Sequence, residues 1–209
     1  WLIQVSFYDQ YYHAIQVRSN NQIKTNVTDH TTNVVNFAGQ ALEAKQVKTI
    51  GDPNGITNTL EITVSTRYEY DDMGRLTKVK QTNPGASELT VAKYEYNPLG
   101  QLVDKKLHST NGTNYLQSVD MRYNIRGQLL SINNSARNIN TDNNDESNDV
   151  FGMEILYDKD ENTGLGNTKY YSGMISAIKW SAASPANTDE RSFKYSYDNL
   201  YRLTLSKYQ

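Results

Sequence analysis

The chain has 209 residues, a net charge of −2 and no cysteine. The lack of cysteine excludes disulfides, thiolate metal sites and a cysteine nucleophile, the scatter of lysine and arginine argues against a nucleic-acid partner, and no uncharged apolar run approaches the ~20 residues of a membrane-spanning helix. The chain has sixteen tyrosines but only four phenylalanines and two tryptophans. This composition favours an all-β chain whose sheet faces are partly exposed to solvent.

The N-terminal part contains degenerate copies of a phrase that becomes regular further along. FYDQYYHAI begins at Phe7, and FAGQAL begins at Phe37. The residue pattern from Gln40 to Thr49 is compatible with either a helix or a strand, and no helix is predicted elsewhere.

The regular copies follow from residue 60. From Leu60 to Tyr70, mostly apolar and aromatic side chains alternate with polar and charged ones over eleven residues. This alternation predicts a half-buried strand of roughly 36 Å. The phrase YEYDDMGRL begins at Tyr68, YEYNPLGQL at Tyr94 and MRYNIRGQL at Met121. The two tyrosines of a copy are two residues apart, so they share one face of the incoming strand.

The middle of each phrase has the chemistry of a tight turn. Asn97 can accept a hydrogen bond from its own backbone two residues on, Pro98 fixes φ for the second turn position, and Gly100 tolerates a positive φ. This combination predicts a hairpin with a type I turn and a glycine bulge. KYSYDNLYRL begins at Lys194 and has Tyr201 at the position of the glycine. In the first copy, Tyr12 occupies the same position. A non-glycine residue there costs about 1 kcal/mol, so we expect these two turns to differ.

Two polar segments interrupt the rhythm. Residues 138–149 (NINTDNNDESND) are predicted to be an acidic loop or a disordered tip. Residues 158–169 form a second polar insertion, whose flanks, Phe151 to Tyr157 and Tyr170 to Trp180, are expected to pair as a further hairpin.

The turn glycines recur at 26 residues, from Gly74 to Gly100, and at 27, from Gly100 to Gly127. Periods this short indicate one hairpin per repeat, stacked on its neighbours, and cross-strand contacts of about 0.2–1 kcal/mol between the tyrosine pairs and the next hairpin. The predicted repeat residues are Tyr68, Tyr70, Asp71, Gly74, Leu76, Tyr94, Tyr96, Asn97, Gly100, Leu102, Tyr123, Asn124, Gly127, Leu129, Tyr195, Tyr197, Asp198 and Leu203.

The phrase Tyr-x-Tyr-Asp/Asn-x-x-Gly-Arg/Gln-Leu resembles the YD repeat of the RHS family, and the segments from Asn148 and Lys169 resemble RHS proteins of Bacteroidetes. The match is good over residues 60–209 and weak before. The resemblance implies hairpins joined into a spiralling sheet, which in complete members closes into a hollow shell around a C-terminal toxin, as in insecticidal toxin complexes; teneurins use a related shell in adhesion. The family's self-cleaving core segment and a toxin domain are not recognisable, so no catalytic residue is carried over.

Other chemistry has weak signals. The histidines His13, His30 and His108 share no metal-ligand spacing. Residues 158–164 resemble a calcium loop whose glycine is one place late, with Lys169 where a bidentate Glu belongs. The remaining weak signals are an acidic tip (Asp142, Asp145, Glu146, Asp149), a phosphate-loop-like composition at Gly164–Lys169, and glycosylation sequons at Asn26, Asn111 and Asn133.

The predicted architecture is all-β, a continuous curved open sheet of antiparallel β-hairpins: degenerate repeats at 1–59, regular repeats at 60–137, the acidic loop at 138–149 and further hairpins at 150–209. Because Trp1 opens the chain without a signal peptide and Gln209 follows a strand-like run, we expect an excised piece of a longer protein.

The predicted role is structural rather than enzymatic, without metal or cofactor: a shell segment of a large secreted or cell-surface bacterial protein, with the remainder of its own chain as partner and C-terminal cargo. The alternative is a surface adhesin or carbohydrate-binding module with glycan partners on tyrosine-rich strands; a polysaccharide-acting hydrolase that uses paired carboxylates is a third reading. Open sheet edges lead us to expect self-association.

Overall fold

The structure is a computed structural model. It describes residues 1–21, 27–50, 60–139, 144, 146, 148–159, 165–183 and 189–209. Residue contacts divide the chain into two compact units. The first contains Trp1–Tyr94 and Leu107–Leu116, and the second contains Glu95–Lys106 and Gln117–Gln209.

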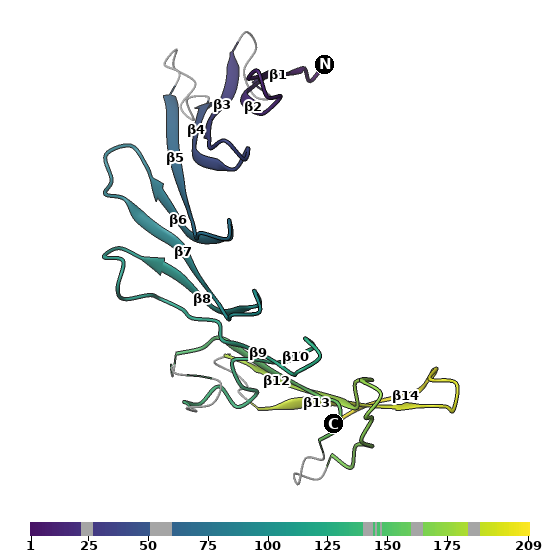
Figure 1. The fold of residues 1–209 in the computed structure, drawn as a ribbon. Helices are drawn as coiled ribbons and strands as arrows, with labels where there is room; N and C mark the ends of the chain where they lie inside the picture. Colours follow the sequence, from purple (N-terminus) through teal and green to yellow (C-terminus); the bar gives the residue numbers. More distant parts are fainter. Residues whose placement is uncertain are drawn as a thin grey trace. The chain divides into compact units, whose positions relative to one another are not determined.

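Fourteen strands form two antiparallel sheets over the described ranges, and neighbours in sequence are neighbours in the sheet (Figure 1). The eight-stranded sheet runs β1 (Gln4–Tyr8), β2 (Ala14–Asn20), β3 (Thr28–Val35), β4 (Ala41–Ile50), β5 (Leu60–Tyr70), β6 (Leu76–Thr82), β7 (Leu89–Tyr96), β8 (Leu102–Ser109). The six-stranded sheet runs β14 (Leu203–Tyr208), β13 (Arg191–Tyr197), β12 (Ala177–Ala182), β11 (Phe151–Leu156), β10 (Leu129–Ile132), β9 (Met121–Tyr123). An isolated antiparallel bridge joins Asp104 of β8 to Asp120, next to β9.

The all-β prediction is confirmed, and neither sheet closes into a barrel. The alternating run becomes β5, which pairs with β6 and has a bulge between Glu69 and Tyr70 next to the turn. The ambiguous run from Gln40 to Thr49 lies almost wholly in β4, which is paired on both sides. The described residues include no helix, and hence none long and apolar enough to cross a membrane.

The predicted hairpin around the second insertion forms, as β11 and β12. The strand begins only at Ala177, later than the predicted Tyr170, because Tyr170 to Gly173 make a turn closed by the Gly173 N–H and the Tyr170 carbonyl. The buried Ser176 then donates its backbone N–H to the Leu156 carbonyl.

The two faces of the six-stranded sheet differ in chemistry. On one face Met153 lies opposite Trp180, and Ile155 lies opposite Ile178. The ring of Phe193 stacks on Trp180 at 5.7 Å between centroids. The other face contains a small apolar core of Leu156, Leu165 and Ala177 together with buried polar side chains.

The segment 138–149 was predicted to be a loop or a disordered tip. Its described residues form no strand of the sheets, but Asn144 and Asp149 are buried, with 2% and 3% of their surface exposed. The Asn144 amide donates to the Asn138 carbonyl at 3.1 Å, and Arg137 donates to the Asp149 carbonyl at 3.3 Å. Hydrogen bonds to the backbone therefore hold these two residues of the predicted loop against the protein.

Candidate functional site

Six five-residue segments of the described chain share one geometry, and we call it the repeated turn. The first residue is Asp or Asn, and its Oδ1 accepts hydrogen bonds from the backbone N–H groups of the third and fifth residues. The backbone closes with bonds from first N–H to fifth carbonyl and from fourth N–H to first carbonyl. The segments are Asp9–His13, Asn36–Gln40, Asp71–Arg75, Asn97–Gln101, Asn124–Gln128 and Asp198–Arg202.

The fourth residue of the repeated turn is always left-handed. In four copies it is glycine, with φ from 76° to 83°. Tyr12 and Tyr201 adopt the same conformation, with φ of 65° and 62°, and their N–H groups make the same closing bond. The expectation that these two turns would differ is therefore wrong. The Asp9 and Asp198 carboxylates hold the backbone through two N–H groups each, which offsets a strain of about 1–2 kcal/mol.

The predicted repeat residues lie at corresponding places. The tyrosines end strands β5, β7, β9 and β13, the Asp or Asn and the glycine are the first and fourth turn residues, and the leucines begin the return strands β6, β8, β10 and β14. The hydroxyl groups of Tyr70 and Tyr197 donate to the carbonyls of Ala41 and Ile175, at 2.9 and 3.0 Å. These bonds reach back to the preceding hairpin. The packing of the rings on the following hairpin stays a prediction.

The sequence phrase includes the fifth residue, but the pairing of that residue with the first residue of the turn was not predicted. It is Gln wherever the first residue is Asn, and Arg or His wherever the first residue is Asp. Asn124 donates its amide to the Gln128 oxygen at 2.9 Å, whereas Arg75 donates its Nε to Asp71 at 2.7 Å. This matched spacing of four residues is legible in the sequence and could have identified the pair.

In several copies the fifth residue also contacts the next turn. The Gln40 amide donates to the Gly74 carbonyl at 2.8 Å, and the Gln128 amide donates to the Gly173 carbonyl at 3.0 Å. The ring of His13 covers Gly39 so closely that a Cβ there would lie 2.8 Å from it. Each such contact fixes one hairpin against the next through a single side chain.

Exchanging one member of a matched pair should destabilise the turn, and exchanging both should restore it. Two backbone N–H groups hold Asn124 Oδ1, so its Nδ2 must face the fifth residue, and Q128R would place two donors together. We expect Q128R to lower the free energy of unfolding by about 1–2 kcal/mol, and N124D/Q128R to recover about 1 kcal/mol. Urea unfolding followed by Trp180 fluorescence measures both; strictly additive effects would contradict the pairing.

The aspartates of the repeated turn are tuned to stay ionised. The backbone N–H of Arg75 is the largest cause that lowers the pKa of Asp71 below 3.8, and the Arg75 side chain adds to it. The N–H of Arg202 does the same for the pKa of Asp198. A carboxyl group whose pKa is lowered by folding stabilises the protein above its unfolded value, and this contribution disappears as the pH falls through the folded value.

Acid should therefore weaken these turns only below about pH 4. We expect carboxyl titration by NMR to give midpoints below 3.8 for Asp71 and Asp198. A midpoint of either carboxyl at or above that value would show that the turn does not bind the ionised form in solution.

The other candidate chemistry finds little support in the described ranges. They contain no group of three or more His, Asp or Glu side chains able to hold a metal ion, and His13 pairs with Asp9 at 3.0 Å. Several sequence signals lie wholly or partly outside the described residues: Asn26, Asp142, Asp145, the calcium-like residues Asp160, Asn162 and Gly164, and the start of the phosphate-like run at Gly164.

No family model and no curated protein matches the chain. Solved structures do match it. The crystal structure of TcdB2-TccC3-TEV matches with a TM-score of 0.52 and 13% identity, over 99% of this chain and 10% of that chain. The crystal structure of TcdB2-TccC3 matches with a TM-score of 0.50 and 14% identity, over 99% of this chain and 11% of that one. The chain thus spans about a tenth of the length of these two chains, and the likeness shows a shared fold.

Proposed function

We propose that this chain is a wall segment of an RHS/YD-repeat shell, in a large secreted or cell-surface bacterial protein. The observation that carries the proposal is the repeated turn, in which six copies make the same hydrogen bonds and residues such as Gln40 and Gln128 contact the next turn. Repetition of this kind builds an extended surface. The likeness in fold to TcdB2-TccC3 over 99% of the chain supports the same reading.

In this proposal the chain acts by exclusion and performs no catalysis of its own. Successive hairpins share backbone hydrogen bonds along each sheet, which leaves no free edge between one repeat and the next. A wall of this construction separates a C-terminal cargo domain of the same protein from its surroundings until delivery. Neither a metal nor a cofactor is required.

The test uses the full-length parent protein. It is purified and compared on a denaturing gel and by native size exclusion. A C-terminal fragment that is cleaved and yet elutes with the shell supports enclosed cargo. A parent protein that lacks any separate C-terminal domain contradicts the proposal.

The aromatic cluster on the six-stranded sheet favours a second candidate, a carbohydrate-binding or adhesive surface. Phe193 stacks on Trp180 and on Tyr195, with centroid distances of 5.7 and 6.3 Å, and contacts Tyr208 at 5.3 Å. All four side chains retain exposed surface. Aromatic rings that carry a polar group can pack on a partner and hydrogen-bond to it at a solvated interface. A glycan screen without a hit at millimolar concentration would remove this candidate.

The edges of the sheets lead to a further expectation for the isolated chain. β1 ends the eight-stranded sheet and β14 ends the six-stranded sheet, so one edge of each strand pairs with no other described strand. All six residues of β14 are exposed. Unpaired strand edges promote pairing with another chain. We expect light scattering to show a molecular mass that rises with concentration; a constant monomer mass would contradict this expectation.

A further inference from the structure

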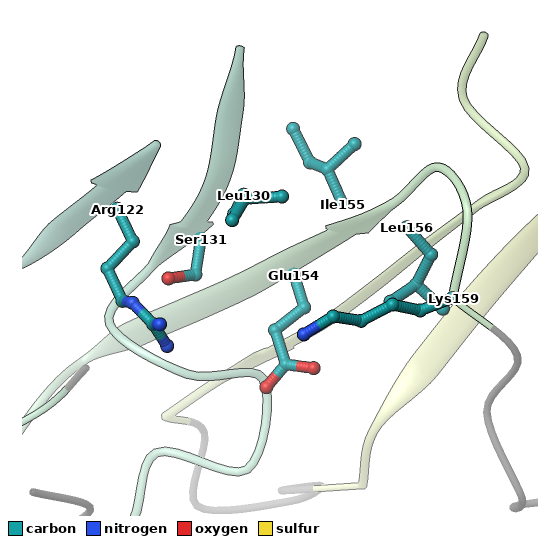
Figure 2. A pocket seen from close by; sticks show the side chains of 7 residues that line it. All are labelled: Arg122, Leu130, Ser131, Glu154, Ile155, Leu156 and Lys159. Carbon is teal, nitrogen blue, oxygen red and sulfur yellow. The ribbon is translucent and has the colours of Figure 1, made fainter. Parts of the chain in front are cut away.

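A small pocket on the polar face of the six-stranded sheet has a donor-rich lining. It has a volume of about 150 Å³ and is lined by Arg122, Leu130, Ser131, Glu154, Ile155, Leu156 and Lys159. Figure 2 shows these side chains, with the charged ends of Glu154 and Lys159 drawn toward the side of Arg122. A cavity of ~150 Å³ is large enough for a molecule the size of benzene.

The strand register explains why the polar groups meet there. Arg122 of β9 lies opposite Ser131 of β10. Ser131 in turn lies opposite Glu154 of β11, and Glu154 lies opposite Lys179 of β12. Side chains directly opposite each other in neighbouring strands lie on the same face, so the four form one row. Lys159 comes from the segment that follows β11.

Three donors of this pocket have no protein acceptor among the described residues. The Ser131 hydroxyl is buried without a hydrogen-bond partner, and Ser131 is only 3% exposed. The side chains of Arg122 and Lys159 make no ion pair with any described residue, although Glu154 lines the same pocket. A buried hydroxyl without a partner destabilises the folded protein, and an acceptor in the pocket would remove that cost.

The carboxylate of Glu154 is already engaged on its other side. Its Oε1 accepts from the backbone N–H of Ser135 at 3.3 Å, and its Oε2 lies 3.9 Å from the ammonium group of Lys179. Lys179 also pairs with Glu190 at 3.1 Å. With Arg122 and Lys159 added, this cluster of two carboxylates and three cations carries one net positive charge.

We propose that this pocket binds a small oxyanion, that is, the phosphate or carboxylate group of a small molecule. The Arg122 guanidinium provides a planar pair of donors, which suits the oxygens of either group. The Lys159 ammonium supplies a second positive charge, and the Ser131 hydroxyl donates from the floor of the pocket. Glu154 opposes the ligand's charge and keeps the affinity modest. This site is independent of the shell role proposed above.

The test is an NMR titration of the full ¹⁵N-labelled chain at constant ionic strength. Inorganic phosphate is used in one arm, acetate in a second and chloride in a third. We expect saturable shifts of the Ser131 and Glu154 amides with phosphate, acetate or both, and none with chloride. The arm that saturates identifies the source of the oxyanion. Shifts that stay linear in both oxyanion arms, or that chloride reproduces, would overturn the proposal.

Variants separate a specific site from general charge. R122Q and K159Q should each weaken binding about tenfold, the value of one charge-assisted hydrogen bond. R191Q is the matched control, because Arg191 lies opposite Trp180 on the other face of the same sheet, and it should leave the affinity unchanged. E154Q keeps the acceptor for Ser135 but removes the opposing charge, so it should tighten binding severalfold. Equal affinities in wild type, R122Q and K159Q would overturn the proposal.

Discussion

The variant G152A is expected to lower the free energy of unfolding by about 3 kcal/mol. Gly152 is buried in β11, where a Cβ atom would overlap the carbonyl oxygen of Asn134 and touch the side chain of Arg137. The clash is with the backbone of Asn134, and the segment from Asn134 to Arg137 cannot shift to relieve it. The Ser181 hydroxyl on the neighbouring strand donates to the Ser135 carbonyl and holds the segment in place. Urea unfolding followed by Trp180 fluorescence measures the loss.

G112A is the matched control for this substitution. Gly112 has a φ of 75°, and nothing lies within 4 Å of its missing Cβ. Its replacement costs only the left-handed strain of about 1–2 kcal/mol. A G152A loss no larger than that of G112A would mean that the segment over β11 is not fixed in solution.

Replacement of Lys179 by methionine is expected to lower the free energy of unfolding by about 2–3 kcal/mol. Lys179 is only 7% exposed, and its ammonium group lies 3.1 Å from Glu190 and 3.9 Å from Glu154. K179M would leave two carboxylates facing each other without their shared cation. Removing one partner of a buried ion pair costs about 3–5 kcal/mol. The solvent that reaches Glu190 reduces this figure.

K207M provides the comparison for K179M. Lys207 in β14 is exposed and lies opposite Lys194 in the same sheet, so its loss should change the free energy of unfolding by about 0.5 kcal/mol or less. Urea midpoints of both variants, at constant slope, report the difference. Equal midpoints would show that the carboxylates around Lys179 are solvated.

Much of the fold follows from local sequence signals. Strict alternation predicts β5, and the Asn-Pro-x-Gly chemistry of Asn97 to Gly100 predicts the repeated turn. Both depend on residues close together in the chain, and such signals survive whatever surrounds them. The turns that contain Tyr12 and Tyr201 were expected to differ from the others, but the Asp at the first position holds the geometry of these turns. Glycine at the fourth position is therefore not required.

The rest depends on contacts that are distant in the chain. The burial of Asn144 and Asp149 could not be predicted, because a polar segment reads as solvated unless its partners are known. The pocket is of the same kind, since Arg122, Glu154 and Lys159 come together only through the register of β9, β10 and β11. Arg122 stands inside a predicted repeat, where sequence reasoning assigned it no role.

The contacts of Gln40 and Gln128 with the turns that follow them have a consequence for how such a chain evolves. Gln40 and Gln128 each bind the first residue of their own turn and a carbonyl of the turn that follows, so these two junctions involve neighbouring turns alone. Duplication or deletion of a whole unit of about 27 residues, as between Gly100 and Gly127, would leave junctions of this kind intact. A single inserted residue within a strand would instead turn its side chains to the opposite face. The gene can therefore lengthen in whole hairpins, and hardly at all in smaller steps.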